Sequence, residues 1–472
     1  MSSRARVLRD RLDHPVIDSD GHHIEFLPLV KDFLREIAGD DVLARFERVT
    51  RGSEIARQLD ADQRRQLSLT RMPFWGLPAS NTDDRATAML PRLLHERLPA
   101  LGIDFAVLYP TYGLIPIHLG DEELRRAGCR AFNRYAAECY AEYGDRLAPV
   151  AAIPMDSPEE AIAELDFAVG ELGLRAAMLA AYAARPYQGE NLPRGAVWLD
   201  FFGFDSPHDY DPVWRRCEEL GVSPSFHSTG MGWGSRASIS NYVYNHIGSF
   251  AASAEGACRA LLLSGVPWRF PKLRFAFLEG GVAWAANLLS DALGHFEKRG
   301  PASIAHYDPA ALDRARLEAL FADYGSEAFR ARAGRLDEAL ALLSDPDEDR
   351  AGIDEFSRLP VRKTEELAAV FCERFAFGCE ADDPMNALAF SPTLSPLGSR
   401  LRAIFSSDIG HWDVPEIDDV LPEAWELVEK GLLSEADFRD FTFAYPAAHW
   451  RAANPGFFAG TAVEAAGADL RA

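Results

Sequence analysis

The sequence predicts an α/β fold, a (β/α)8 TIM barrel, and two observations carry this prediction. Short apolar runs of strand length recur along the 472 residues, and each run is followed by a longer segment with helical periodicity. This alternation is typical of a parallel sheet built from strand–helix units. The second observation is the number of runs, because there are eight of them and eight strands close a barrel of this type.

The predicted strands are spread over the whole chain. They occupy residues 15–22, 104–110, 147–154, 175–182, 223–229, 273–279, 374–380 and 403–408. In such barrels the active site lies at the carboxyl ends of the strands. The polar residues that end the eight runs are therefore the candidate functional residues.

The segments between the strands carry helix signals. In residues 157–173, apolar side chains recur at spacings of four, three and four along one helical face, namely Ala161, Leu165, Ala168 and Leu172. An early proline, Pro158, and acidic residues in the first turn mark the start of this helix. Residues 211–220 predict a second helix, which Gly221 ends before the fifth strand.

Two segments are longer than a strand–helix unit requires. Residues 27–101 separate the first two strands, and residues 282–371 separate the sixth and seventh. The second segment contains charged helical sequence over 309–343 and an acidic turn at 344–349. We interpret both segments as lids or subunit contacts inserted into one barrel domain that spans residues 1–472.

Composition excludes several classes of protein. Apolar residues make up 48% of the chain and charged residues 26%, which is enough for a packed core and gives no indication of disorder. The 49 basic residues face 72 acidic ones, for a net charge of −23. Such a surface repels phosphate backbones and anionic membranes alike. We expect neither nucleic acid nor a membrane as partner.

The first residues, the apolar stretches and the cysteines predict the cellular compartment of the protein. The first residues lead into a charged segment without an apolar leader, and no stretch of about 18 apolar residues follows. The six cysteines form no CxxC pair, so we expect reduced, buried thiols. These features together predict a soluble cytoplasmic protein.

Ligand-type side chains end four of the predicted strands. They are Asp20 and His22 with Glu25 after the first strand, His227 after the fifth, Glu279 after the sixth, and Asp408 with His411 after the eighth. Alternate strand residues share a face, so Asp20 and His22 can grip one ion from the same side. Carboxylates and imidazoles bind Zn, Mn or Fe, and no cysteine stands at these four ends, which disfavours a closed structural zinc site.

Each of these residues alone has a simpler explanation. Asp20 before glycine is common turn chemistry, a lone histidine is usually a core residue, Glu279 could open a helix, and Asp408 could cap one. Their conjunction is harder to explain by packing, because buried carboxylates are costly unless they are paired or bound to a metal. We therefore predict a catalytic metal site with open coordination positions.

Five segments resemble a known family. They are GIDFAVLYPT at 102–111, DRLAPV at 145–150, FHSTG at 226–230, EGGV at 279–282 and SDIGH at 407–411. With these segments the chain resembles the amidohydrolase-2 branch of the metal-dependent amidohydrolase superfamily, which includes aminocarboxymuconate-semialdehyde decarboxylase and the resorcylate-type decarboxylases. The resemblance covers nearly the whole chain.

The resemblance implies a ligand set. The family's His-x-His falls on Asp20 and His22, its strand-five histidine on His227, and its strand-eight aspartate on Asp408. Its strand-six histidine falls on Glu279. The two carboxylates that replace histidines make the site harder and more anionic, which favours Fe, Mn or a second cation over a single zinc ion.

The number of divalent ions stays open at one or two per chain. Strand four has no lysine, which excludes the carbamate bridge of the superfamily's two-metal hydrolases. A two-metal site would instead need a bridging carboxylate from Glu25, Glu279, Glu380 or Asp408.

Three functions are compatible with the sequence. The first is hydrolysis or decarboxylation of a small carboxylic or amide-like substrate by a metal-activated water, with Asp408 as general base, His411 as auxiliary acid or substrate contact, and Glu279 as a further catalytic candidate. The second is a dinuclear Fe/Fe or Mn/Fe monooxygenase, an alternative that Glu279 and the acidic end of strand seven support. The third is a binding or scaffolding paralogue without catalysis.

Partners are predicted only in general terms. A small molecule is the expected substrate. A homodimer, or a hetero-oligomer with a paralogue, is the expected assembly, and residues 282–371 are the best candidate surface for it.

Overall fold

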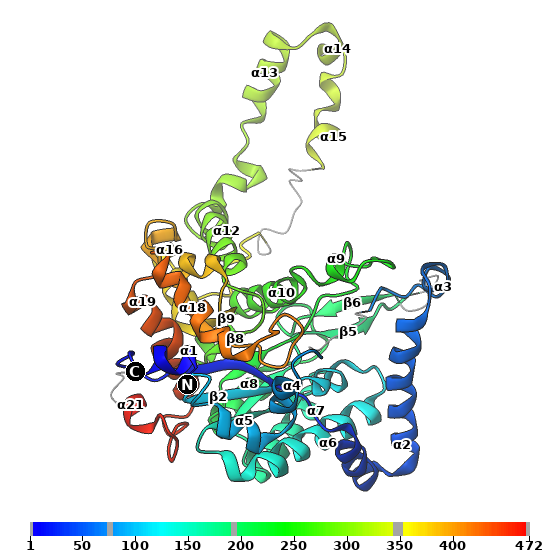
Figure 1. The fold of residues 1–472 in the computed structure, drawn as a ribbon. Helices are drawn as coiled ribbons and strands as arrows, with labels where there is room; N and C mark the ends of the chain where they lie inside the picture. Colours follow the sequence, from blue (N-terminus) through cyan, green and yellow to red (C-terminus); the bar gives the residue numbers. More distant parts are fainter. Residues whose placement is uncertain (1–2, 73–78, 190–195, 343–352, 469–472) are drawn as a thin grey trace.

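Eight parallel strands form the central sheet of the protein. The structure, a computed structural model, describes residues 3–72, 79–189, 196–342 and 353–468 (Figure 1). The sheet has the order β1-β2-β3-β4-β7-β8-β9-β10. The strands are β1 Ile17–His23, β2 Phe105–Pro110, β3 Leu147–Ile153, β4 Ala176–Leu179, β7 Pro224–Phe226, β8 Phe275–Phe277, β9 Phe375–Glu380 and β10 Arg402–Ser406. The predicted (β/α)8 barrel and all eight of its strands are confirmed.

Helices surround this sheet (Figure 1). The longer ones in the body are α2 Leu27–Gln58, α4 Thr82–Met89, α6 Glu122–Tyr140, α7 Pro158–Leu165, α8 Asp211–Leu220, α10 Ser249–Leu263, α12 Ala283–Arg299, α16 Thr364–Arg374 and α18 Val420–Glu429. The shorter ones are α1 Arg4–Arg9, α3 Ala61–Leu67, α5 Pro91–Arg97, α9 Tyr242–His246, α11 Val266–Arg269, α17 Ala387–Phe390, α19 Glu435–Arg439, α20 Tyr445–Arg451 and α21 Glu464–Ala468. Within the described ranges, none of the helices is both long and apolar enough to cross a membrane.

The helix signals of the sequence are confirmed at both places. The Ser157 hydroxyl accepts a hydrogen bond from the Glu160 backbone N–H and so caps α7. This helix continues as a π-helical turn over Asp166–Glu171, so the predicted segment is helical over most of its length. Gly221 ends α8 in the left-handed region, with a φ of 69°, which a residue without a side chain adopts at little cost.

A short hairpin was not predicted. Strands β5 Ala183–Pro186 and β6 Val197–Asp200 pair antiparallel between β4 and α8. Each has only four residues, which is too short for a clear period-two pattern. The buried Asp200 carboxylate accepts a hydrogen bond from Arg185 at 3.1 Å and so ties the two strands together.

The two long insertions differ in structure. Residues 27–101 form α2 to α5, and α2 packs along α6 on the outside of the barrel. In the second insertion, α12 is an ordinary barrel helix that buries Leu289 and Leu293. Beyond it, α13 Arg314–Tyr324, α14 Glu327–Arg330 and α15 Leu336–Leu340 extend away from the body (Figure 1). The predicted acidic turn at 344–349 lies outside the described residues.

The barrel closes between β1 and β10 through one buried carboxylate. Asp18 is fully buried, and its Oδ1 accepts hydrogen bonds from the backbone N–H groups of Ser407 at 3.0 Å and Asp20 at 3.2 Å. Its Oδ2 accepts a 2.5 Å hydrogen bond from the Ser407 hydroxyl. Burial raises the pKa of Asp18 to about 6 despite these bonds. The Asp18–Ser407 contact thus fixes the first and last strands to each other.

The chain around this contact is shaped to fit it. The pairing of β1 with β2 shifts its register between Asp18 and Gly21. A Cβ atom on Gly21 would lie 2.5 Å from Asp18 Oδ2, so only glycine fits beside the buried carboxylate. Two backbone hydrogen bonds continue the closure, from Asp408 N–H to the Asp20 carbonyl at 3.0 Å and from His22 N–H to the Ile409 carbonyl at 3.2 Å. The residues that close the barrel are therefore neighbours of the predicted metal ligands.

Two neighbouring serines provide a test of this contact. We expect Ser407→Ala to lower the free energy of unfolding by about 1–3 kcal/mol, because it leaves the buried Asp18 carboxylate short of a donor. Within the described ranges the Ser406 hydroxyl has no hydrogen-bond partner, so Ser406→Ala is the matched control and should change stability by less than about 0.5 kcal/mol. Urea unfolding of both variants measures the difference. Equal losses would show that Asp18 does not hold the barrel closed.

Candidate metal centre

Four of the predicted ligands converge at the mouth of the barrel. The Nε2 atoms of His22 and His227 lie 3.2 Å apart. Asp20 Oδ1 lies 3.6 Å from His22 Nε2 and 3.7 Å from His227 Nε2, and Asp408 Oδ1 lies 3.4 Å from His22 Nε2. All four side chains are buried. Ligand atoms about 2.1 Å from one ion lie about 3–3.5 Å from one another, so these spacings suit a common divalent ion.

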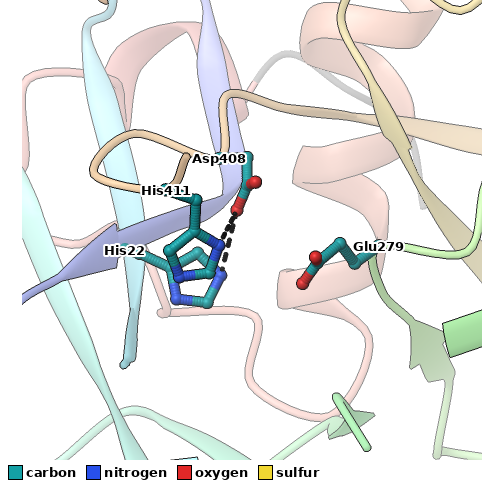
Figure 2. Close-up of side chains that lie close together, drawn as sticks. All are labelled: His22, Glu279, Asp408 and His411. Carbon is teal, nitrogen blue, oxygen red and sulfur yellow. Dashed lines mark ion pairs between the residues drawn. The ribbon is translucent and has the colours of Figure 1, made fainter. Parts of the chain in front are cut away.

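Two further predicted residues border this cluster. His411 Nδ1 lies 2.7 Å from Asp408 Oδ1, and its ring is inclined by 34° to the His22 ring at a centroid distance of 3.8 Å. Glu279 approaches from the opposite side, with Oε2 3.0 Å from His227 Nε2. Figure 2 shows the Glu279 carboxylate directed toward the space in front of Asp408 and His411. The six residues thus enclose one small volume.

The backbone is strained where two of these residues stand. Glu279 and Asp408 have φ angles of 55° and 50°, in the left-handed region that residues other than glycine rarely adopt. Such conformations cost on the order of 1–3 kcal/mol and persist where the surrounding structure imposes them. Glu279 stands two positions after the end of β8, and Asp408 stands two positions after the end of β10. The strained backbone at these positions directs each carboxylate into the mouth of the barrel.

Several carboxylate oxygens of the cluster lack a hydrogen-bond donor among the described residues. Both carboxylate oxygens of Asp20 and of Asp408, and Oε2 of Glu279, are buried without a hydrogen-bond donor among the described residues. Buried carboxylates in that state are strongly destabilising unless a cation or donors compensate them. A divalent ion supplies this compensation, and oxygen and imidazole donors are suitable ligands for Zn, Mn or Fe. The residues present therefore fit a metal ion.

The pKa values of the cluster also indicate that its buried carboxylates require a cation. Burial raises the pKa of Asp20, Glu279 and Asp408 well above the ordinary range, and neighbouring carboxylates add to the shift at Asp408. Burial also lowers the pKa of His22 and His227 and brings that of His411 to about 3. A cation at the centre favours ionised carboxylates and neutral imidazoles together.

Two sets of donor atoms in the cluster share one histidine. The atoms of each set converge closely, Asp20 with His22 and His227, and His22 with Glu279, Asp408 and His411. Both sets use His22. A neutral imidazole has one free lone pair and so ligates one ion, which means that His22 can serve only one of the two sets at a time.

Some predicted residues lie outside the cluster. Glu25 accepts hydrogen bonds from the backbone N–H groups of Tyr112 and Gly113, both at 2.9 Å. The structure therefore places Glu25 at the start of a 3-10 turn rather than among the ligands. Glu380 lines a cavity beside the cluster, together with His246 and Asp413.

Two residues of this region were missed from the sequence. Asp18, which closes the barrel, stands in the same Asp-Ser-Asp segment as Asp20, but a packing role for a carboxylate has no sequence signal. Asp413 follows Asp408 by five positions on a loop. The sequence shows that Asp413 lies near Asp408 along the chain, but it does not show where the Asp413 side chain points.

Comparisons with known proteins give one family-model match and several similar solved structures. The family model described as Amidohydrolase matches residues 95–328. A solved amidohydrolase from Mycobacterium avium subsp. paratuberculosis is 15% identical, with a TM-score of 0.52 over 93% of this chain and 100% of its own. A 2,6-dihydroxybenzoate decarboxylase from Rhizobium is 16% identical, with a TM-score of 0.47 over 93% of this chain and 99% of its own. At these identities the solved structures show likeness of fold alone. No curated protein matches the chain.

Removal of metal tests the centre. We expect protein loaded with Mn²⁺ or Zn²⁺ to carry one ion per chain, and chelation to lower its Tm by about 2–5 °C, because the ion stabilises only the folded state. His227→Asn should lose both the ion and the Tm shift. His246→Asn, outside the ligand set, is the control and should keep both. Elemental analysis and thermal unfolding give the two readouts, and an ion retained in His227→Asn would contradict the assignment.

Proposed function

We propose, from the match of residues 95–328 to the amidohydrolase family model, that the protein is a metal-dependent hydrolase of small amide- or ester-like molecules. One observation carries the proposal. Asp20, His22, His227 and Asp408 come from three separate strand ends and enclose a position where their buried, unpartnered atoms need a cation. A purely structural role would not require uncompensated carboxylates at the open end of a barrel.

The four ligands have a clear chemical task. A divalent ion held by Asp20, His22, His227 and Asp408 supplies a Lewis acid that polarises a scissile carbonyl and acidifies water. The four ligands lie at the ends of β1, β7 and β10, and none of them follows β8. The side toward Glu279 is then left for substrate.

The remaining groups act on protons and on the substrate. Asp408 accepts a proton from the attacking water and returns it to the leaving group. His411 Nδ1 lies 2.7 Å from Asp408 Oδ1, and this close contact holds the carboxylate in position. Glu279, with an oxygen that lacks a donor, accepts a hydrogen bond from an N–H group of the substrate.

Hydrolysis is favoured over decarboxylation by the charge of the mouth. A substrate carboxylate would have to approach Glu279, Glu380 and Asp413, and no lysine or arginine lines the described part of the adjoining cavity. Like charges at close range disfavour such binding. A neutral carbonyl meets no such barrier. No observation on the described residues favours the dinuclear monooxygenase alternative.

Kinetics with and without the acid–base residues test the proposal. We expect metal-loaded protein to hydrolyse members of a panel of 4-nitrophenyl esters and 4-nitroanilides. Asp408→Asn should lower kcat by about 10²–10⁴-fold because the proton acceptor is gone. His411→Phe should lower kcat by about tenfold or more while the ion stays bound, because His411 positions Asp408 without ligating the metal.

The control is a histidine remote from the mouth. Among the described residues, His295 on α12 hydrogen-bonds through Nδ1 to the Asp291 carbonyl, which accepts, so His295→Asn should leave turnover unchanged. Elemental analysis of each variant separates loss of metal from loss of proton transfer. Full activity of metal-loaded Asp408→Asn would overturn the proposed role of this residue, and absence of hydrolysis with every member of the panel would argue for the decarboxylase chemistry instead.

A further inference from the structure

A cavity of about 380 Å³ adjoins the metal centre on the Glu279 side. Residues that follow β7, β8, β9 and β10 line it. Four of them are acidic, Glu279, Glu380, Asp383 and Asp413, and none of the described residues that line it is a lysine or an arginine. The cavity is therefore strongly negative.

This charge is not neutralised by the protein. Within the described ranges, Glu380, Asp383 and Asp413 form no ion pair with a basic side chain, and Glu279 meets only His227. Desolvation and the facing carboxylates of Asp413 and Glu279 raise the pKa of Glu380 to about 7. Burial likewise raises the pKa of Asp383. Both shifts reflect carboxylates that lack a positive partner.

A second, independent observation indicates a ligand. The Glu279 side chain is only 6% exposed, yet its Oε2 has no hydrogen-bond donor and it borders the cavity. Figure 2 shows the Glu279 carboxylate directed toward Asp408 and His411. Asp413 Oδ1 is also enclosed and without a donor. Buried acceptors in this state need a donor or a cation from outside the protein.

Aromatic rings form part of the same wall. Trp412 and Phe250 line the cavity, and the His246 ring lies between them at centroid distances of 5.6 Å and 5.9 Å. Trp412 is 39% exposed. Faces of tryptophan and phenylalanine attract organic cations through the ring quadrupole. Carboxylates and aromatic rings together are the groups that ammonium ions prefer as neighbours.

An organic cation suits this cavity better than a second metal ion. Zinc-type sites have at least three protein donor atoms that converge closely on one point. Among the described residues the only such groups are the two at the metal centre, and neither contains Glu380, Asp383 or Asp413. These three carboxylates are spread along the wall, which favours a larger cation over a point charge.

We propose that this cavity binds a cationic nitrogen group of the substrate, an ammonium or a guanidinium, beside the scissile bond held at the metal centre. The proposal rests on the proposed hydrolase function and names its substrate class, amides or esters of cationic compounds. Glu380 and Asp383 bind the charge, and Glu279 lies between this charge and the reacting group.

Two probes that differ only in charge test the cavity. Choline and 3,3-dimethyl-1-butanol have the same shape, and only choline is cationic. We expect choline to bind metal-loaded protein about tenfold more tightly than the alcohol, as measured by calorimetry, because carboxylates and rings act on the charge alone. Added salt should reduce the difference, since exposed charges are screened.

Variants of the wall locate the binding. The double variant Glu380→Gln with Asp383→Asn should remove the preference for choline. Asp382→Asn is the matched control, because Asp382 is exposed, lies between the two and does not line the cavity; it should keep the preference. Equal affinity for the two probes, or a preference that survives in the double variant, would overturn the proposal.

The metal content of the same samples separates the remaining outcomes. One ion per chain in both wild type and double variant supports an organic cation. A second ion in wild type that the double variant loses would show that the cavity holds a metal, and would overturn the proposal. Wild type without any bound ion would contradict the proposed hydrolase function, while the choline result would still decide whether the cavity binds cations.

Discussion

The hydrogen bonds of the buried Asp18 carboxylate to Ser407 close the barrel between its first and last strands, and the metal centre depends on this closure. Asp20 and His22 stand on β1, and Asp408 stands just beyond β10. Backbone hydrogen bonds from Asp408 to Asp20 and from His22 to Ile409 set these two strand ends at one fixed offset. The distances among the ligands are therefore consequences of how the sheet is closed. The strained φ angles of Glu279 and Asp408 are imposed by the same framework.

Negative charge is the common feature of the mouth. The chain carries a net charge of −23, but that excess matters most where carboxylates are buried and cannot be solvated. The inner residues form two compact sets of donor atoms, Asp20 with His22 and His227, and His22 with Glu279, Asp408 and His411. The outer residues, Glu380, Asp383 and Asp413, belong to neither set, and they have aromatic neighbours. Two kinds of cation, one metallic and one organic, would compensate the inner and the outer residues in turn.

The sequence predicted the barrel and the convergence of its ligands because both follow from strand geometry. Strand runs alternate with helical segments, and residues at the carboxyl ends of parallel strands meet at one face. Asp20, His22, His227, Glu279, Asp408 and His411 were found in this way. The role of Glu25 was not predictable. Its carboxylate accepts hydrogen bonds from the backbone N–H groups of Tyr112 and Gly113. These residues are far from Glu25 along the chain, so the sequence gives no indication of the contact. The β5–β6 hairpin and the loop position of Asp413 were missed for a related reason: short strands and loops lack a period from which side-chain direction can be inferred.

The most direct test of the account is an anomalous diffraction measurement on crystals grown with manganese. The account predicts one strong peak per chain, bonded to Asp20, His22, His227 and Asp408 at about 2.0–2.3 Å, with the Glu380 side of the cavity free of metal. A peak elsewhere, or no peak within bonding distance of His22 and His227, would contradict the central claim that the closed barrel brings these residues together around an ion.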